Sequence, residues 1–323
     1  MMSLSTSPVL PVSVVIPVRN ESSSLGELLG CLSALSPRPA EVIFVDTGSS
    51  DGSVGSIESW MGLAKQDDIQ FQLCHRPDAY PGAARNVGVK AATQEWIAFL
   101  DAGISPNADW LGKLWARQQR SHAQAVYGSC NFGSEHPFGR MICAVSYGQG
   151  RATPVLPASL FHRDVFEKSG FFEEHLRSGE DILWNQSISN AGIATAYCPE
   201  ALVKYRHFPE TLGQALKKWF VYEQSAAVAG VGSARKNFML LAIALIYALS
   251  ALGVPGALPA MLAYFVVRGG IEPYRRSTDR PWWRFWWQPI LMIPVAAMLD
   301  VATLAGRITA SLGLSKFRLI SER

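Results

Sequence analysis

The chain has 323 residues, of which 49% are hydrophobic, so it can hold two average domains and bury a sizeable core. Its 29 basic and 26 acidic residues leave a net charge of only +3, which argues against nucleic acid as a partner. The five cysteines stand at wide spacings without a CxxC pair, which argues against a zinc site and indicates free thiols in a reducing compartment.

The distribution of charged residues divides the chain into two regions. The first apolar run, at residues 9–18, has no basic flank and no small-residue cleavage site, so it is predicted to be a strand and not a signal peptide. Residues 238–267 and 285–299 contain no charged side chain. We therefore predict a soluble region followed by a membrane-associated region.

The soluble region alternates strand and helix patterns. Residues 12–16 are a β-branched run that stops at Pro17, as a buried parallel strand would. Serines at 22–24 can cap a helix over residues 22–35, whose leucines recur at helical spacing. Further strands are predicted at 41–45, 69–74, 96–100 and 124–127, and further helices at 53–64 and 82–92. This alternation predicts a doubly wound, mainly parallel α/β sheet.

Polar side chains follow several of the predicted strands. Asn20 and Glu21 follow the first strand, Asp46 follows the second, and Asp101 follows the fourth. In such a sheet, ligands bind beyond the carboxyl ends of the strands. Each of these residues alone could equally be a turn former or a helix cap. Together they predict a ligand site at this edge, with carboxylates that suit a ligand or its metal.

Five segments occur in the order and with the spacing of a known family. They are VSVVIPVRNE at 12–21, EVIFVDTGSSDGS at 41–53, GAARNVGVKAA at 82–92, WIAFLDAG at 96–103 and RSGEDILW at 177–184. With them the chain resembles the inverting family-2 glycosyltransferases over residues 12 to about 210. The resemblance implies a nucleotide-sugar-binding α/β fold and a sugar transferase. The expected parts are a catalytic domain (1–209), a connecting amphipathic helix (210–236) and a membrane-associated helical region (237–323).

The resemblance also implies roles for individual residues at the donor site. Asp46 would bind the base of the donor, and Arg85 would reach the base or the diphosphate. Asp101 matches the first aspartate of the family's DxD motif, which meets the donor ribose and the metal. The donor pocket would also be lined by Pro17, Arg19 and Glu21.

The metal motif departs from the family pattern, because Gly103 stands where the second aspartate is expected. A hard cation such as Mg²⁺ or Mn²⁺ suits carboxylate and phosphate oxygens. Either Asp101 and the diphosphate hold this ion together with His207, or cationic groups such as Arg85 do part of its work. His207 stands where some relatives place a metal ligand, and as a surface histidine it would equally cap the following helix.

The GED motif at 179–181 matches the acceptor-side acidic motif of the family. The resemblance implies that Asp181 removes the proton of the acceptor hydroxyl, with Glu180 as its neighbour. A positioned carboxylate contributes about 10²–10⁴-fold to such a reaction. The same pair would also stabilise a helix N-terminus. Trp184 is expected either to stack on the acceptor or to be a buried core tryptophan.

The apolar segment at 238–267 has 30 residues, more than the ~20 that cross a bilayer, and glycines and prolines interrupt it. It forms either one spanning helix or a hairpin of two short helices. Both of its flanks are basic, so the positive-inside rule favours a hairpin with both flanks in the cytoplasm. The cluster RPWWRFWWQP at 280–289 is typical of a membrane interface. We expect a mainly monotopic attachment, with a two-span arrangement as the alternative.

The helical pattern at 210–229 either lies along the bilayer or belongs to the core.

The favoured function is an inverting glycosyltransferase at the cytoplasmic face of the membrane. It would move a sugar from a nucleotide-diphosphate donor, UDP by family prior, to a hydroxyl of a lipid-linked or glycan acceptor during polysaccharide synthesis. One alternative is a polyprenyl-phosphate glycosyltransferase, whose acceptor needs no base. The other is a catalytically silent scaffold with the same fold, motivated by Gly103.

Overall fold

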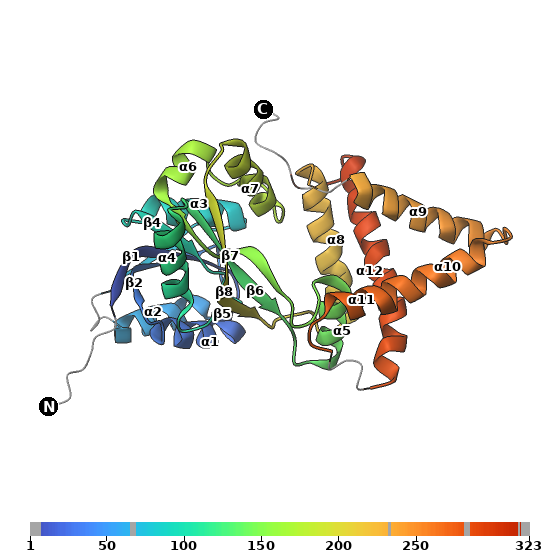
Figure 1. The fold of residues 1–323 in the computed structure, drawn as a ribbon, viewed down its shortest axis with the longest axis horizontal. Helices are drawn as coiled ribbons and strands as arrows, with labels where there is room; N and C mark the ends of the chain where they lie inside the picture. Colours follow the sequence, from blue (N-terminus) through green and yellow to red (C-terminus); the bar gives the residue numbers. More distant parts are fainter. Residues whose placement is uncertain (1–7, 65–68, 232–233, 281–284, 316, 318–323) are drawn as a thin grey trace. The chain divides into compact units, whose positions relative to one another are not determined.

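The computed structural model describes residues 8–64, 69–231, 234–280, 285–315 and 317. The chain divides into two compact units, of which the first comprises residues 1–131, 152–175 and 180–205. The second comprises residues 132–151, 176–179 and 206–323 (Figure 1). Residues 132–151 and 176–179 lie inside the range predicted to be catalytic, so the structural division interleaves the two regions that the sequence placed in succession.

In the described residues of the first unit, an eight-stranded sheet has the order β3-β2-β1-β4-β7-β6-β8-β5. Its strands are β1 (Val9–Val18), β2 (Arg38–Asp46), β3 (Gln70–His75), β4 (Trp96–Phe99), β5 (Ile104–Pro106), β6 (Ala125–Phe132), β7 (Ala152–His162) and β8 (Thr195–Tyr205). β1 pairs in parallel with β2 and β4, and β2 pairs in parallel with β3. β7 runs antiparallel to β4 and β6, and β5 runs antiparallel to β8. The predicted α/β class is confirmed, with a mixed sheet.

The helices of the first unit are α1 (Ser22–Ser33), α2 (Ser53–Ala64), α3 (Pro81–Ala91), α4 (Trp110–Ser121), α6 (Arg163–Ser169) and α7 (Glu180–Asn190). The three helices predicted from the sequence correspond to α1, α2 and α3 and are confirmed. The strand residues 12–16 are fully buried, as their β-branched run predicts. Ser13 and Gln72 both hydrogen-bond to the buried carboxylate of Glu41, so this polar group inside the sheet is satisfied.

The second unit is helical. Its elements are α5 (Pro137–Ser146), α8 (Leu212–Val228), α9 (Ala234–Ala251), α10 (Ala257–Val266), the π-helical turn η1 (Val267–Ile271), α11 (Glu272–Arg276) and α12 (Trp287–Ser311). α8 begins with a capping box formed by Thr211 and Gln214. It packs along α12, where a Cβ atom at Gly306 would lie 2.4 Å from the carbonyl oxygen of Phe220. The helix predicted at 210–229 is therefore present, and it packs against α12 of this unit.

The apolar segment at 238–267 forms a helical hairpin. α9 and α10 are joined by a turn at residues 252–256 (Figure 1). Within this turn, Gly253 and Gly256 have φ values of 70° and 85°. Such values suit glycine because it has no Cβ atom. The rings of Tyr247 and Tyr264 pack 6.0 Å apart between the two helices. Of the two alternatives for this segment, the structure has the hairpin.

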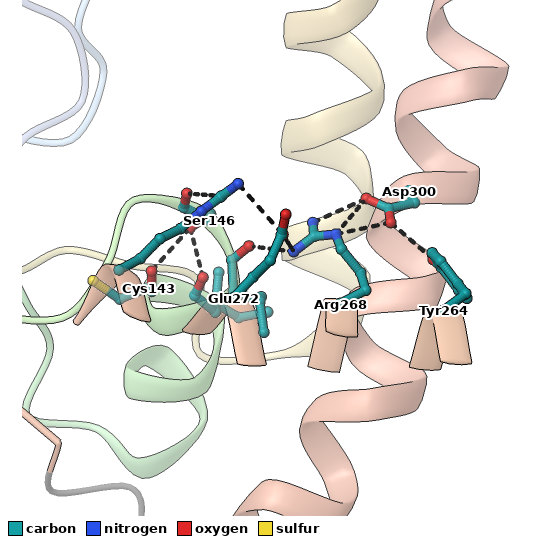
Figure 2. A network of polar contacts seen from close by, with 9 residues as sticks. Cys143, Ser146, Tyr264, Arg268, Glu272 and Asp300 are labelled. Carbon is teal, nitrogen blue, oxygen red and sulfur yellow. Dashed lines mark hydrogen bonds and ion pairs between the residues drawn. The ribbon is translucent and has the colours of Figure 1, made fainter. Parts of the chain in front are cut away.

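Arg268 links three helical segments of the second unit. Its Nε and Nη2 atoms lie 2.9 Å from the two carboxylate oxygens of Asp300 on α12. Its Nη1 atom donates to the carbonyl oxygen of Val145 on α5 at 2.7 Å. Figure 2 shows Arg268 between Asp300 and Tyr264 on one side and Glu272 and α5 on the other. Asp300, the one charged residue that interrupts the apolar pattern at 290–306, thus has an ion-pair partner.

Candidate functional site

Hydrogen bonds join the loops that follow β1 and β2. Asn20 Oδ1 accepts from the backbone N–H of Ser50 at 2.8 Å, and the backbone N–H of Asn20 donates to Ser49 Oγ at 3.0 Å. Asp51 Oδ2 accepts from the backbone N–H of Ser22 at 2.9 Å. Asn20 has a φ of 54°, which asparagine adopts more readily than most residues. The two loops therefore form one connected rim at the carboxyl ends of parallel strands.

Asp46 is the last residue of β2 and is 5% exposed. Its carboxylate accepts hydrogen bonds of 3.1 Å from the backbone N–H groups of Gly48 and Ser49, and His75 Nδ1 lies 3.5 Å away. Burial alone would raise the pKa of Asp46, but the hydrogen bonds from Ser49 and Gly48 outweigh burial and hold the pKa below its ordinary value. Asp46 is therefore ionised and fixes the loop that was predicted to bind the base.

The three other residues predicted for the donor pocket lie at the same edge. Pro17 is half-buried near the end of β1. Arg19 is exposed, and its guanidinium lies 3.4 Å from Asp78. Glu21 is the N-cap residue of α1, and its Oε2 atom accepts from Ser24 Oγ at 2.6 Å. Their location agrees with the strand-end rule, while their contact with a donor stays a prediction.

Arg85 connects the two acidic motifs. It lies on α3 and is 4% exposed. Its Nη1 atom is 2.7 Å from Glu180 Oε1, and its Nη2 atom is 2.9 Å from Asp101 Oδ1. Its Cζ atom lies 5.8 Å from the ring centroid of Phe172. The arginine predicted to reach the donor thus bridges the carboxylates after β4 and at the start of α7.

Close packing fixes the position of α3. Pro81 occupies the first turn of this helix, where its missing N–H has no cost. A Cβ atom at Gly82 would lie 2.2 Å from the carbonyl oxygen of Glu173, and one at Gly88 would lie 2.2 Å from Val15 Cγ1. Glycine has no side chain at either position, so the helix can lie close to its neighbours. From this position Arg85 reaches both acids.

The carboxylates around Arg85 compete for one positive charge. Burial raises the pKa of Glu180 to about 7, with Arg85 lowering it and Asp181 raising it. For Arg85, burial would lower the pKa, but Asp101, Glu180 and Asp181 raise it above its ordinary value. Among the described residues, none hydrogen-bonds to Glu180 Oε2. Arg85 therefore stays charged, whereas Glu180 exchanges its proton near neutral pH.

The GED motif lies where α7 begins. Gly179 has a φ of 92°, and Glu180 and Asp181 form the first turn of the helix. Their negative charges stabilise this N-terminus, as expected from the helix dipole. Asp181 is half-buried, and its Oδ1 atom accepts from the backbone N–H of Ile182 at 2.9 Å. A helix-start role and a proton-accepting role are compatible at this position.

Trp184 lies in the core of the first unit. It is 2% exposed, stacks on Phe166 with ring centroids 4.9 Å apart, and packs 4.3 Å from the ring of Phe172. Its indole N–H donates to the carbonyl oxygen of Gly170 at 2.8 Å. With its ring enclosed, Trp184 presents no face to an acceptor. The acceptor-stacking expectation is corrected here to that of a core tryptophan.

The predicted metal ligands belong to different units, Asp101 to the first and His207 to the second. Across the described ranges, no group of three or more His, Cys, Asp and Glu side chains could hold a metal ion. The side chain of Asp101 is 42% exposed, with one oxygen paired to Arg85. Gly103 adds no ligand. A Mg²⁺ or Mn²⁺ ion at Asp101 would have to take most of its oxygens from a bound diphosphate.

Asp51 lies in the loop after β2, at the edge of the candidate site, and was not among the residues predicted for the site. Its Oδ1 atom accepts from the hydroxyl and the backbone N–H of Ser53, the first residue of α2. These bonds, together with that from Ser22, lower the pKa of Asp51 far below its ordinary value. An aspartate two residues before a helix start is a recognisable capping signal. It could have been found from the sequence.

Comparison with known proteins places these motifs in context. The family model described as "Glycosyl transferase family 2" matches residues 13–169. A pre-mycofactocin glycosyltransferase of Mycobacterium tuberculosis is 32% identical over 235 residues, which are 68% of this chain and 47% of that protein. Glycosyltransferase AglE of Haloferax volcanii is 28% identical over 65% of this chain and 70% of its own length. The chain thus spans about half the length of the M. tuberculosis relative.

The fold also occurs in a solved structure. The mannosyltransferase PcManGT from Pyrobaculum calidifontis, in complex with GDP-Man and Mn²⁺, superposes with a TM-score of 0.61 at 18% identity. The superposition covers 94% of this chain and 88% of that protein. At this identity the likeness concerns the fold, which is of the GT-A type.

Proposed function

We propose that this chain, which belongs to glycosyl transferase family 2, moves a sugar from a nucleotide-diphosphate donor to a hydroxyl of a lipid-linked or glycan acceptor. The configuration at the anomeric carbon would invert. The observation that carries the proposal is the Arg85 bridge, because it places the acid after β4 and the acid at the start of α7 around one cation. A donor-side and an acceptor-side motif are thereby held together.

On the donor side, the rim formed by the loops after β1 and β2 would receive the nucleotide. Asp46 would bind the base, with Pro17, Arg19 and Glu21 around it, and Asp101 would face the ribose and the diphosphate. Backbone hydrogen bonds already orient Asp46 before any ligand arrives. Preorganised groups cost little to order on binding. A nucleotide diphosphate is the donor class that we propose, with UDP first among the bases to test.

On the acceptor side, Asp181 would act as the base. The acceptor O–H proton would pass to the Asp181 carboxylate while the acceptor oxygen forms a bond to the sugar C1 atom. The bond between C1 and the diphosphate oxygen would break, and the electron pair would leave with the diphosphate. Glu180 would orient the start of α7 through Arg85. A bound Mg²⁺ or Mn²⁺ would neutralise charge on the leaving diphosphate, with Asp101 as its protein ligand.

The membrane setting is part of the proposal. The exposed leucines of the α9–α10 hairpin support attachment to a membrane. The basic flanks of residues 238–267 favour a catalytic unit that faces the cytoplasm. α12 is the one helix in the described residues that is long and apolar enough to cross a membrane, and a core helix would pass the same test. An enzyme held at the bilayer would meet a lipid-linked acceptor at high local concentration.

Purified protein in a thermal-shift panel of nucleotide diphosphates, with and without Mn²⁺, tests the donor site. Binding of one nucleotide raises the Tm, because a ligand that binds the folded state stabilises it. Asp46→Ala removes the ligand-induced shift, whereas Glu58→Ala, an exposed carboxylate on α2, retains it. Absence of any shift, together with no consumption of nucleotide sugars, would establish the silent scaffold instead.

A further inference from the structure

α12 has apolar residues on both its buried and its exposed face. Its buried face includes Met292, Val295, Ala296 and Leu299. Apart from Ser311 at its last residue, its exposed side chains are also apolar: Ile290, Leu291, Pro294, Met298, Val301 and Ile308. A helix at a water-facing surface normally carries polar residues on that face. The exposed stripe of α12 is therefore suited to lipid.

The buried face of α12 argues against a crossing of the bilayer. α8 packs along it, with Gln224 Nε2 donating to Thr309 Oγ1 at 3.0 Å and Arg307 lying 3.1 Å from Glu223. α8 also carries Lys217 and Lys218. If α12 crossed the membrane, these charges would enter the hydrocarbon with it, and charged side chains near the bilayer centre are costly. α12 is therefore confined to the interface plane.

The α9–α10 hairpin, unlike α12, is suited to insertion into the hydrocarbon. Its exposed leucines occur on both helices and at the turn, and they include Leu241, Leu245, Leu252, Leu258 and Leu262. Residues 238–267 contain no charged side chain. At about 1.5 Å per residue, the 12 residues of the apolar stretch Leu240–Ala251 extend about 18 Å, and the 10 residues of α10 about 15 Å. The hydrocarbon core is about 30 Å thick, so the hairpin is long enough for one leaflet only.

Side chains near the start of α12 and on α11 have the composition of a membrane–water interface. Trp286 is 79% exposed, and Phe285 and Tyr274 are about half exposed. The guanidinium of Arg280 lies 4.1 Å from the ring centroid of Tyr274. Trp and Tyr rings and arginines are enriched at the headgroup level of bilayers. The remainder of the RPWWRFWWQP cluster, residues 281–284, lies outside the described residues.

We propose that the second unit attaches to a lipid bilayer from one side, with the α9–α10 hairpin inserted into a single leaflet and α12 lying in the interface along its exposed stripe. The helix that composition alone would select as a span is thus the scaffold, and the shorter hairpin is the inserted element. The Arg268–Asp300 ion pair fastens η1, which directly follows α10, to this scaffold (Figure 2). This inference deepens the membrane attachment proposed above and does not depend on the transfer chemistry.

Depth-dependent quenching tests the arrangement in the full chain. The partly exposed Cys31 and Cys74 are replaced by alanine, and Cys130, Cys143 and Cys198 are buried. An environment-sensitive fluorophore is attached at Leu252→Cys, at Val301→Cys or, as a control on α2, at Leu63→Cys, whose leucine is 81% exposed. The vesicles contain phosphatidylcholine and phosphatidylglycerol, with nitroxide labels either shallow or deep in the acyl chains.

We expect the label at 252 to be quenched more by the deep nitroxide, the label at 301 more by the shallow one, and the label at 63 by neither. Stronger quenching of position 301 by the deep nitroxide would show that α12 crosses the bilayer and would overturn the proposal. So would absence of quenching at both 252 and 301 together with a dimer in light scattering, because a second copy would then cover the apolar face.

A second measurement uses variants that remain folded. Leu252→Glu with Leu258→Glu lowers co-flotation with the same vesicles at least about tenfold, because burial of two leucines is lost. Leu63→Glu leaves co-flotation unchanged. The nucleotide-induced thermal shift is measured on each variant as a check of the first unit. Unchanged co-flotation of the double variant contradicts the hairpin insertion, whereas vesicle binding without any nucleotide binding contradicts the proposed transfer activity alone.

Discussion

Arg85 donates a hydrogen bond to Glu180 Oε1 across 2.7 Å, although 95 positions separate the two residues in the chain. The same guanidinium reaches Asp101 at 2.9 Å. A single buried side chain therefore links the start of α7 to the acid that follows β4. Because the guanidinium of Arg85 contacts both acids, a change at Arg85 affects both motifs together.

Arg85→Met should lower the free energy of unfolding by about 3 kcal/mol, because removal of one partner leaves a buried acid uncompensated. The double variant Arg85→Met with Glu180→Gln should recover part of this loss. Urea unfolding of the four proteins in this cycle measures the coupling. Strictly additive effects would show that the two side chains do not interact energetically.

Glu180 should make the stability of the first unit depend on pH. Burial raises its pKa from 4.5 to about 7, so between these values the folded state binds more protons than the unfolded state. The free energy of unfolding should therefore fall as the pH rises through this range, by up to about 3 kcal/mol, and level off above it. Glu180→Gln should remove this contribution. Equal slopes for the two proteins between pH 4.5 and 7 would contradict the assignment.

Asp181→Asn should lower kcat about 10²–10⁴-fold if the acceptor is a hydroxyl, since the acceptor proton then lacks its base. The nucleotide-induced thermal shift should be unchanged, because the donor side is intact. Asn190→Ala, at the other end of α7, serves as the control variant. Full activity of Asp181→Asn would favour a phosphate acceptor, which needs no base, and so the polyprenyl-phosphate alternative.

Gly103→Asp should strengthen the dependence on a metal ion. Gly103 is not among the glycines with a positive φ, so its backbone accepts an aspartate. A second carboxylate beside Asp101 adds a hard oxygen ligand for Mn²⁺. The difference in thermal shift by nucleotide with and without Mn²⁺ should be larger in the variant than in the natural chain. An identical difference would show that position 103 does not face the bound ion.

Gly82→Ala should destabilise the first unit by about 1–3 kcal/mol, because the new methyl group would collide with the backbone of Glu173. Gly55→Ala on α2 has nothing within 4 Å and should instead stabilise by about 0.5–1 kcal/mol. Chemical denaturation compares the pair. Equal effects of the two alanines would mean that α3 can shift without cost.

The local patterns of the sequence predicted the parallel part of the sheet well. β1 and β2 are β-branched runs ended by turn residues, and their lengths exceed the predicted ones at both ends. β7 and β8 were missed because they contain Pro154, Pro157 and Pro199, and proline in a run argues against a strand. Pro154 nevertheless pairs with Ser129 of β6. Tertiary pairing thus overrides the local preference.

The site was predictable to the extent that it follows from strand ends. Asp46 and Asp101 lie at the expected edge because β1, β2 and β4 are parallel, which periodicity could indicate. The contact of Arg85 with Glu180 joins two helices far apart in the sequence. The periodicity of neighbouring residues cannot predict such a long-range contact. Trp184 is buried because Phe161, Phe166 and Phe172 pack against its ring. These phenylalanines come from other segments of the chain, so the local sequence around Trp184 could not predict its burial.

The hydrogen bonds between the loops after β1 and β2 have a consequence for protein engineering. Asn20 and Asp51 each accept a hydrogen bond from a backbone N–H group of the opposite loop. The conformation of each loop therefore depends on the sequence of the other. A graft of residues 46–53 from another transferase would arrive without its matching partner loop and would lose its shape. Exchange of base preference should therefore succeed only when residues 19–24 and 46–53 are transplanted as one cassette.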